Sequence, residues 1–313
     1  MTNPEEDFIG IDLGGTNLRA GLVDAEGRIL KRAATLTRAA EGKEKVISRI
    51  TGLVKELSDS RHIPVGVASP GPVERGTGVL LNPPNLPGWH RVDLKYELQS
   101  RLRRKVYVEN DANMVACGEF HYGAGKGARS LLCLTIGTGI GSGLILDGSL
   151  YTGDHGFAAE LGHTVIDPRG PDCGCGARGC LESLAAARAM VSEARRLIRD
   201  GAATTLEGAE GELTAEAIGL AAAEGDAVAE QVLERAGRHL GIAISNAVAL
   251  LDVSLVVVGG GISRAKDLIL EPIRKTVART LLDYDLRELE IVPSELGDDA
   301  GILGIFAYCR SSV

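Results

Sequence analysis

The sequence predicts an α/β protein with two related domains that face a cleft. A pattern of strand, glycine turn and strand occurs near residues 8–23 and again near residues 131–146. Each copy is followed by segments whose apolar residues recur with helical spacing. The chain has 313 residues, 41 glycines and 44% hydrophobic content, so it is long enough for two domains rich in tight turns.

The N-terminal half begins with a predicted antiparallel meander of three strands. Pro, Gly and Asn are frequent from Ser69 to Trp89, which predicts a long ordered loop. A loop of this length in a compact protein is often functional. An apolar helix is expected to follow Asn110 and Asp111. We expect strands over residues 8–11, 18–23, 28–36, 63–68 and 105–109, and a helix over residues 43–58.

The C-terminal half repeats the meander and then becomes mainly helical. A second meander begins at Ser130 and turns through the glycines of residues 137–143. Helices predominate from the cysteine-containing loop to about residue 251, and residues 254–258 form a buried strand. The predicted division is a smaller domain at residues 1–115, a larger domain at residues 116–300 and a last helix, residues 301–313, that packs back on the smaller domain.

The composition argues against several classes of partner. The net charge is −8, from 34 basic and 42 acidic residues, which opposes nucleic acid or an anionic membrane. No run of 18 apolar residues predicts a membrane span. The N-terminal sequence MTNPEEDF is short and acidic, unlike a secretory signal. Six cysteines in such a chain predict reduced thiols and a metal site, and hence the cytoplasm.

The most specific pattern in the chain is a histidine followed by three clustered cysteines. His163, Cys173, Cys175 and Cys180 are the ligand types of a tetrahedral structural zinc. The glycines between the cysteines allow the backbone to fold tightly around a small ion. Free buried thiols are the alternative. A site with four protein ligands has no open position, so we expect a structural ion that staples a loop beside an active site.

Two glycine turns, at residues 14–15 and 137–143, are candidates for a two-sided phosphate clamp, and a third, at residues 259–261, is a place where the base and ribose of a nucleotide could lie. Backbone N–H groups of such turns can hold phosphate oxygens, and a carboxylate at a strand end, such as Asp12, can hold Mg²⁺ through water. A plain hairpin turn is the alternative for any single one. None fits the Walker-type phosphate loop. The candidate nucleotide-binding residues are Asp12, Gly14, Gly15, Thr16, Asn17, Gly137, Thr138, Gly139, Gly259, Gly260 and Gly261.

Four further polar side chains are candidates for the chemistry and the acceptor. Asp111 follows a strand and can act as the general base that aligns a hydroxyl for in-line attack on a γ-phosphoryl group. A helix N-cap is the alternative role for this aspartate. Glu160, His163 and Glu182 are suited to sugar hydroxyls, and His163 can use one ring nitrogen for zinc and the other for substrate. Surface carboxylates beside a zinc ligand are the alternative.

Six motifs together resemble those of the ROK family of sugar kinases and repressors. They are DLGGTN at 12–17, ENDAN at 109–113, GTGIGSG at 137–143, ELGH at 160–163, CGCGARGCLE at 173–182 and GGGIS at 259–263. Their order covers residues 8–305. The chain departs from related glucokinases at Ala159, before the ELGH glutamate, and at Ser142, where glycine is common. Neither departure removes a functional group.

The resemblance implies an actin-like ATPase fold, related to ribonuclease H, with ATP and sugar in the cleft. It implies ATP-dependent phosphorylation of a hexose at the 6-hydroxyl, most similar to a glucokinase, with Mg²⁺ beside ATP and structural Zn²⁺. Asn85 and Asn110 are implied as sugar ligands, together with Asp111, Glu160, His163 and Glu182. The alternative acceptor is N-acetylmannosamine or N-acetylglucosamine. A homodimer or homotetramer is also implied.

Two interpretations without catalysis compete with the kinase. The family's repressors carry an N-terminal DNA-binding module, and the first predicted strand here starts at Phe8, which leaves no room for one. A non-catalytic sugar sensor is the other interpretation, and the presence of both Asp12 and Asp111 argues against it. We therefore expect an enzyme.

Overall fold

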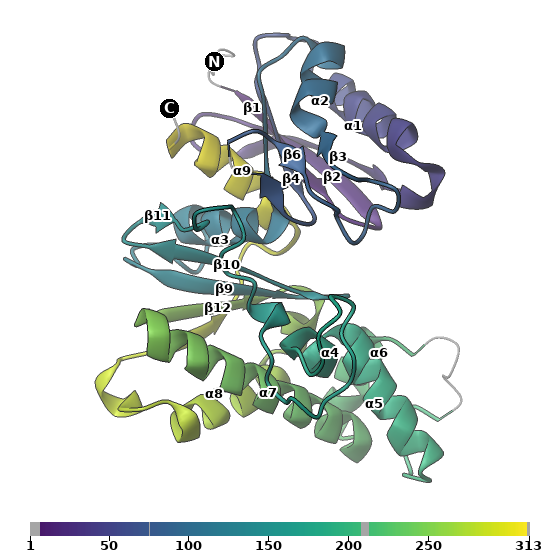
Figure 1. Cartoon of the computed structure of the whole chain (residues 1–313), viewed down its shortest axis with the longest axis vertical. Helices are drawn as coiled ribbons and strands as arrows, with labels where there is room; N and C mark the ends of the chain where they lie inside the picture. The colour runs from purple at the N-terminus through teal and green to yellow at the C-terminus, as the bar shows by residue number, and fades with distance from the viewer. Residues whose placement is uncertain (1–6, 75, 208–212, 312–313) are drawn as a thin grey trace.

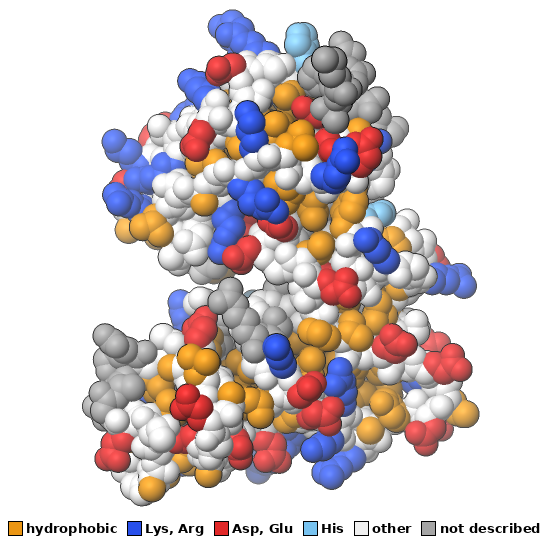
Figure 2. Space-filling view, turned by 180° about the vertical axis from the view of Figure 1, so that it is seen from behind, with side chains coloured by type: hydrophobic (Ala, Val, Ile, Leu, Met, Phe, Trp, Pro, Cys, Tyr) orange, Lys and Arg blue, Asp and Glu red, His pale blue; other side chains and the backbone are white. Residues whose placement is uncertain are grey.

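The computed structural model describes residues 7–74, 76–207 and 213–311, so the acidic N-terminal residues 1–6 lie outside it. Two five-stranded sheets form an upper and a lower half of the molecule (Figure 1). The space-filling view of the opposite face shows a notch between these halves (Figure 2). None of the described helices is long and apolar enough to cross a membrane.

The first sheet has the strand order β3-β2-β1-β4-β8. Its first three strands pair antiparallel, whereas β4 and β8 join in parallel. The predicted first helix, α1, buries Val46, Ile50 and Val54 on one face, as the spacing requires. The elements of this half are β1 (Phe8–Leu13), β2 (Asn17–Val23), β3 (Ile29–Leu36), η1 (Ala39–Glu41), α1 (Lys43–Leu57), β4 (Val65–Ser69), α2 (Leu94–Leu102) and β8 (Val106–Asn110).

The predicted long ordered loop contains two short strands. It contributes β5 (Val73–Glu74) and β6 (Val79–Leu80) to a small three-stranded sheet with β7 (Val92–Asp93). Trp89 at its end is fully buried with Leu80 and Leu86, so the loop has its own apolar anchor. Helix α2, capped by the Asp93 side chain, was not predicted. The anchored loop passes beside the turn between β1 and β2.

The second sheet has the order β11-β10-β9-β12-β13 and repeats the plan of the first. An antiparallel meander is again extended by two parallel strands. This repetition confirms the predicted duplicated α/β architecture. The elements are β9 (Leu131–Ile136), β10 (Ile140–Leu146), β11 (Ser149–Leu150), η2 (Leu161–His163), α4 (Leu181–Ala185), α5 (Ala187–Arg199), α6 (Ala215–Ala223), α7 (Ala227–Leu251), β12 (Leu255–Gly259), η3 (Gly261–Ala265), α8 (Asp267–Thr280), η4 (Tyr284–Leu286) and β13 (Glu290–Pro293).

Helices α3 (Asp111–Tyr122) and α9 (Ala300–Ser311) lie between the two sheets (Figure 1). The two helix backbones approach each other closely at glycines. A methyl group added to Gly118 would come within 3.2 Å of the Gly304 nitrogen. Helix α9, preceded by η5 (Gly297–Asp299), also packs on β1 and β4. The predicted boundary at residues 115/116 falls inside α3, and that division stays a prediction.

Candidate active site

A cavity of about 710 Å³ lies where the three predicted glycine turns meet. The turn between β1 and β2, the turn between β9 and β10, and the segment after β12 all line it. Two guanidinium groups, Arg19 and Arg188, line the same space. Glycine turns and guanidinium groups together suit a polyphosphate. The predicted residues on this lining are Gly14, Gly15, Thr16, Asn17, Gly137, Thr138 and Gly261.

The remaining predicted glycines shape the turns themselves. Gly260 has a φ of +86° and lies so close to Ile136 that an added methyl group would come within 2.6 Å of the Ile136 nitrogen. Gly259 ends β12 beside Ser294. Gly139 faces the Glu182 carboxylate, which a methyl group at this position would overlap. The backbone of Ile136 therefore requires glycine at residue 260, independent of any ligand, whereas the nearest neighbours of Gly259 and Gly139 are side-chain atoms.

Asp12 lies near the end of β1, and its carboxylate lies beside the Arg19 guanidinium. The Arg19 guanidinium is 3.7 Å from the Asp12 carboxylate and 3.2 Å from that of Asp298. Burial raises the pKa of Asp12 to about 6, with Arg19 opposing and Asp298 adding to the shift. A carboxylate beside a polyphosphate cavity fits a water-mediated Mg²⁺ contact, because this ion prefers oxygen ligands and keeps much of its hydration.

Asp111 is the first residue of α3, directly after β8. The helix N-cap is Asn110, whose side-chain oxygen accepts from the Asn113 nitrogen at 3.0 Å. The alternative role of Asp111 as the cap is therefore wrong. One Asp111 oxygen accepts from the Ala112 nitrogen at 2.8 Å and from Asn110 Nδ2 at 3.2 Å. A partly exposed carboxylate at a helix N-terminus remains available to a substrate.

The pKa of Asp111 is raised by its environment. Burial, together with the negative charges of Asp12 and Glu160, raises its pKa to about 7. A carboxylate with a pKa near neutrality accepts a proton far more readily than one near 4. Because the charges of Asp12 and Glu160 both raise the pKa of Asp111, the nucleotide side and the predicted sugar side of the site meet at this carboxylate.

The predicted sugar ligands Asn85, Glu160, His163 and Glu182 come from separate segments of the chain. Glu160 immediately precedes η2, which ends at His163, and burial raises the Glu160 pKa while His163 lowers it and Glu182 raises it. Glu182 lies in the first turn of α4. Asn85 is exposed and lies over the first phosphate turn, since a methyl group on Gly15 would come within 2.9 Å of Asn85 Cβ. Their role in sugar binding stays a prediction.

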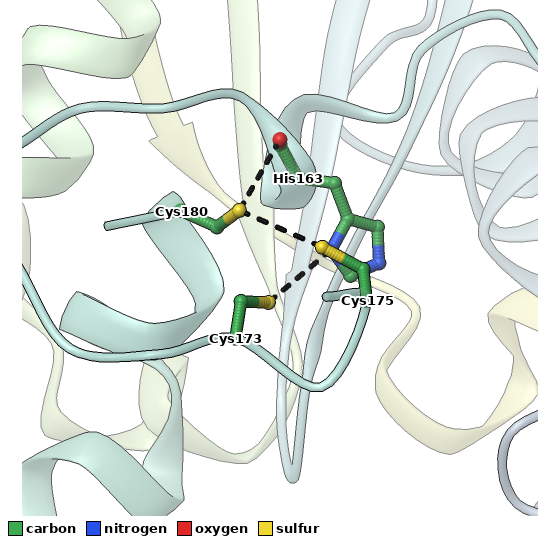
Figure 3. A group of neighbouring side chains, drawn as sticks. All are labelled: His163, Cys173, Cys175 and Cys180. Atoms are coloured by element: carbon green, nitrogen blue, oxygen red, sulfur yellow. Dashed lines mark hydrogen bonds between the residues drawn. The ribbon is translucent and has the colours of Figure 1, made fainter. Parts of the chain in front are cut away.

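The four predicted zinc ligands form one cluster (Figure 3). Their ligand atoms all lie within 4.8 Å of one another. His163 Nδ1 is 3.7 Å from Cys173 Sγ, and the Sγ atoms of Cys175 and Cys180 are 3.7 Å apart. Zn–S bonds of about 2.3 Å at tetrahedral angles place neighbouring ligands ~3.7 Å apart, so the geometry fits zinc. The use of Nδ1 leaves Nε2 of His163 for another partner.

Some lining residues could not be found from local motifs. Arg188 is the second residue of α5 and Glu216 is the second residue of α6, and both line the nucleotide cavity only because these helices pack beside the glycine turns. Arg19 lies two residues after Asn17 in β2, so the alternation of a strand could have indicated its side. Ser142 links β10 to the ELGH loop, donating to the Ala159 carbonyl and accepting from the Leu161 nitrogen.

Comparison with known proteins gives consistent matches over the full chain. The sequence profile of the ROK family matches residues 8–312. A glucokinase of Thermotoga maritima is 41% identical, with 99% of each chain covered. A glucokinase of Streptomyces coelicolor is 36% identical, with 96% of this chain and 97% of that protein covered. The crystal structure of a ROK family glucokinase from Streptomyces griseus, in complex with glucose and AMPPNP, superposes with a TM-score of 0.87 at 36% identity, covering 97% and 99% of the two chains.

Proposed function

The chain belongs to the ROK family, and from this premise we propose that it is a glucokinase with an actin-like ATPase fold. It transfers the γ-phosphoryl group of ATP to the 6-hydroxyl of glucose. The observation that carries the proposal is Asp111, a carboxylate with a pKa raised to about 7 where the two sides of the site converge. Glucokinase relatives that align over nearly all of the chain support the same reaction.

Asp111 acts as the general base. Its carboxylate accepts the proton of the 6-hydroxyl as the oxygen attacks the γ-phosphorus in line, and the leaving β-phosphate stays in the turns at residues 14–17 and 137–138. Bound with ATP, Mg²⁺ would neutralise phosphate charge, and Asp12 is the residue that would hold it through water. Arg19 and Arg188 line the same cavity and add positive charge.

The adenine end of the nucleotide belongs in a second cavity of about 980 Å³. This cavity adjoins the first, and Ala215, Glu216, Gly261 and Ile262 line both. Its walls include α6, η3 and α8, and apolar surface predominates in them. A flat base suits an apolar slot with a few polar groups at its edge, so the polyphosphate would extend from here toward Asp111.

The sugar would be held from the opposite side of Asp111. Asn85, Asn110, Glu160, His163 and Glu182 supply amide, imidazole and carboxylate groups of the kind that hydrogen-bond sugar hydroxyls. The zinc set is closed by four protein ligands, so its ion would fix the loops that carry His163 and Glu182 and take no direct part in the chemistry. Domain closure would then exclude water from the γ-phosphate.

The cysteines and the family relation bear on the compartment, the assembly and the preferred sugar. All six cysteines are free thiols, and three of them belong to the zinc set, which favours a cytoplasmic enzyme of carbohydrate metabolism and glycolysis. The resemblance supports a homodimer or homotetramer. Identity to glucokinases favours glucose over the N-acetylhexosamine alternative.

A coupled assay of ADP release tests the proposal. We expect the highest kcat/KM for glucose among glucose, mannose, fructose, N-acetylglucosamine and N-acetylmannosamine. Asp111→Asn keeps the shape of the side chain but removes the base, which should lower kcat about 10²- to 10⁴-fold. A variant that turns over saturating glucose at the wild-type rate would contradict the assigned role. A preferred N-acetylhexosamine would change the substrate and leave the mechanism intact.

A further inference from the structure

We propose that the zinc module, defined as residues 159–163 and 173–187, holds the phosphate-binding turn Gly137–Gly139 in shape, so that zinc and the Glu182 carboxylate set nucleotide affinity even without sugar. Glu182 is thus a positioning residue for the nucleotide in addition to its predicted contact with sugar. The inference rests on the proposed function, because it assigns the turn to ATP phosphate. It is carried by hydrogen bonds that connect both zinc-bearing segments to one hairpin.

The segment after Cys180 clamps the phosphate turn at both ends. Glu182 Oε2 accepts from the backbone nitrogen of Ile140, the first residue of β10, at 3.0 Å. The Ala187 nitrogen at the start of α5 donates to the Gly137 carbonyl at 3.0 Å. The carboxylate also lies against Gly139, which tolerates its approach because it has no side chain. The segment from Glu182 to Ala187 therefore contacts the first and last glycines of the turn and the residue that follows them.

The segment that ends at His163 is bonded to the same hairpin. Ser142, buried in β10, donates to the Ala159 carbonyl and accepts from the Leu161 nitrogen at 3.2 Å. Gly162 lies against Ile140, where an added methyl group would come within 3.2 Å of Ile140 Cβ. Both segments that supply zinc ligands therefore hold the first residues of β10.

The zinc ligands join these two segments to each other. The Leu181 nitrogen donates to the Thr164 carbonyl at 3.0 Å, and Cys180 Sγ approaches the His163 carbonyl at 3.4 Å. In Figure 3, His163 and Cys180 come from separate stretches of chain and point to one centre, with Cys173 and Cys175 on the loop between them. Removing the ion would leave the two segments joined by backbone hydrogen bonds alone, and would thereby loosen the two supports of the phosphate turn.

The decisive experiment is calorimetric titration of Mg·AMPPNP into the protein without sugar. Glu182→Ala removes the acceptor for the Ile140 nitrogen and should raise the nucleotide Kd about 3- to 10-fold, as expected for one part-buried hydrogen bond. Glu182→Gln keeps an acceptor oxygen and should bind nucleotide like the wild type. Glu193→Ala, on α5 but paired with Arg196 and Arg235, is the matched control and should also be unchanged.

Hydrogen exchange of the Ile140 amide tests the link to zinc. In wild-type protein depleted of zinc by a chelator, we expect faster exchange of this amide and weaker nucleotide binding. Wild-type nucleotide affinity in Glu182→Ala, or unchanged Ile140 exchange after verified zinc loss, would overturn the clamp and leave the glucokinase assignment standing. A wild-type protein that binds no Mg·AMPPNP would overturn both.

Discussion

The raised pKa of Asp111 predicts a specific pH dependence of catalysis. A general base must be ionised to accept a proton, and kcat/KM for glucose reports the ionisation of the enzyme before glucose binds. With a pKa of about 7, roughly one molecule in eleven has the base ionised at pH 6 and about ten in eleven at pH 8. We therefore expect kcat/KM for glucose to rise about tenfold between these pH values. An aspartate with an ordinary pKa would give a flat profile over this range.

The assay is initial-rate kinetics with saturating MgATP from pH 5.5 to pH 8.5. Asp111→Asn should lose the rising limb together with most of its activity. A wild-type profile that is flat between pH 6 and pH 8, or a variant that retains the limb, would refute the argument from burial and neighbouring charge. The pKa of Asp12 is raised to about 6, so protonation of this carboxylate should further lower kcat/KM at the acid end of the pH range.

The raised pKa of Asp111 also makes the stability of the folded protein depend on pH. Because the folded-state pKa of Asp111 lies above its unfolded value, its stabilising contribution is present below pH 3.8 and is lost as the pH rises through about 7. Asparagine does not titrate and lacks this pH dependence. The Tm advantage of Asp111→Asn over the wild type should therefore be larger at pH 8 than at pH 5. Equal differences at both pH values would contradict a raised pKa of Asp111 in the folded protein.

Three further variants test the framework around the site. Glu119 is fully buried and accepts hydrogen bonds from the Ala124, Glu295 and Leu296 nitrogens and from Ser294 Oγ. Glu119→Ala should therefore lower the free energy of unfolding, measured in urea, by about 3 to 5 kcal/mol. The control is Glu234→Ala, at an exposed residue, which should leave this free energy unchanged. Cys175→Ser should lose zinc by metal analysis, lower the Tm and raise the KM for glucose; wild-type zinc content in this variant would exclude Cys175 as a ligand. Ala159 has a φ of +63°, so Ala159→Gly should be more stable than the neighbouring Ala158→Gly by about 1 to 2 kcal/mol, and the reverse order would be inconsistent with strain at this position.

The duplicated architecture and the zinc set could be predicted from the sequence because their signals are local. Strands that end in glycine turns are marked by alternation and by residues that permit close approach, as at Gly14 and Gly137. Three cysteines and a histidine on a short, glycine-rich stretch are typical of a metal site, and the structure brings their ligand atoms within 4.8 Å of one another. These features depend little on how distant segments pack.

Other features depend on tertiary packing and left no local signal. The two-residue strands β5 and β6 are too short to show a period, and their stability comes from the burial of Trp89 and Leu80. Asn110 and Asp111 are both good helix caps, so the sequence could not show which one caps α3. The bond between Glu182 and the Ile140 nitrogen joins residues 42 positions apart and becomes visible only in the folded chain.

The central claim is that the protein phosphorylates glucose at the 6-hydroxyl with ATP. The most direct measurement is ³¹P NMR of the products formed from glucose and MgATP, with 6-deoxyglucose as the matched acceptor that lacks only the reacting oxygen. We predict glucose 6-phosphate and ADP in equal amounts with glucose, and neither product with 6-deoxyglucose. ADP that forms at the same rate with both sugars, or phosphate found at another hydroxyl, would contradict the account.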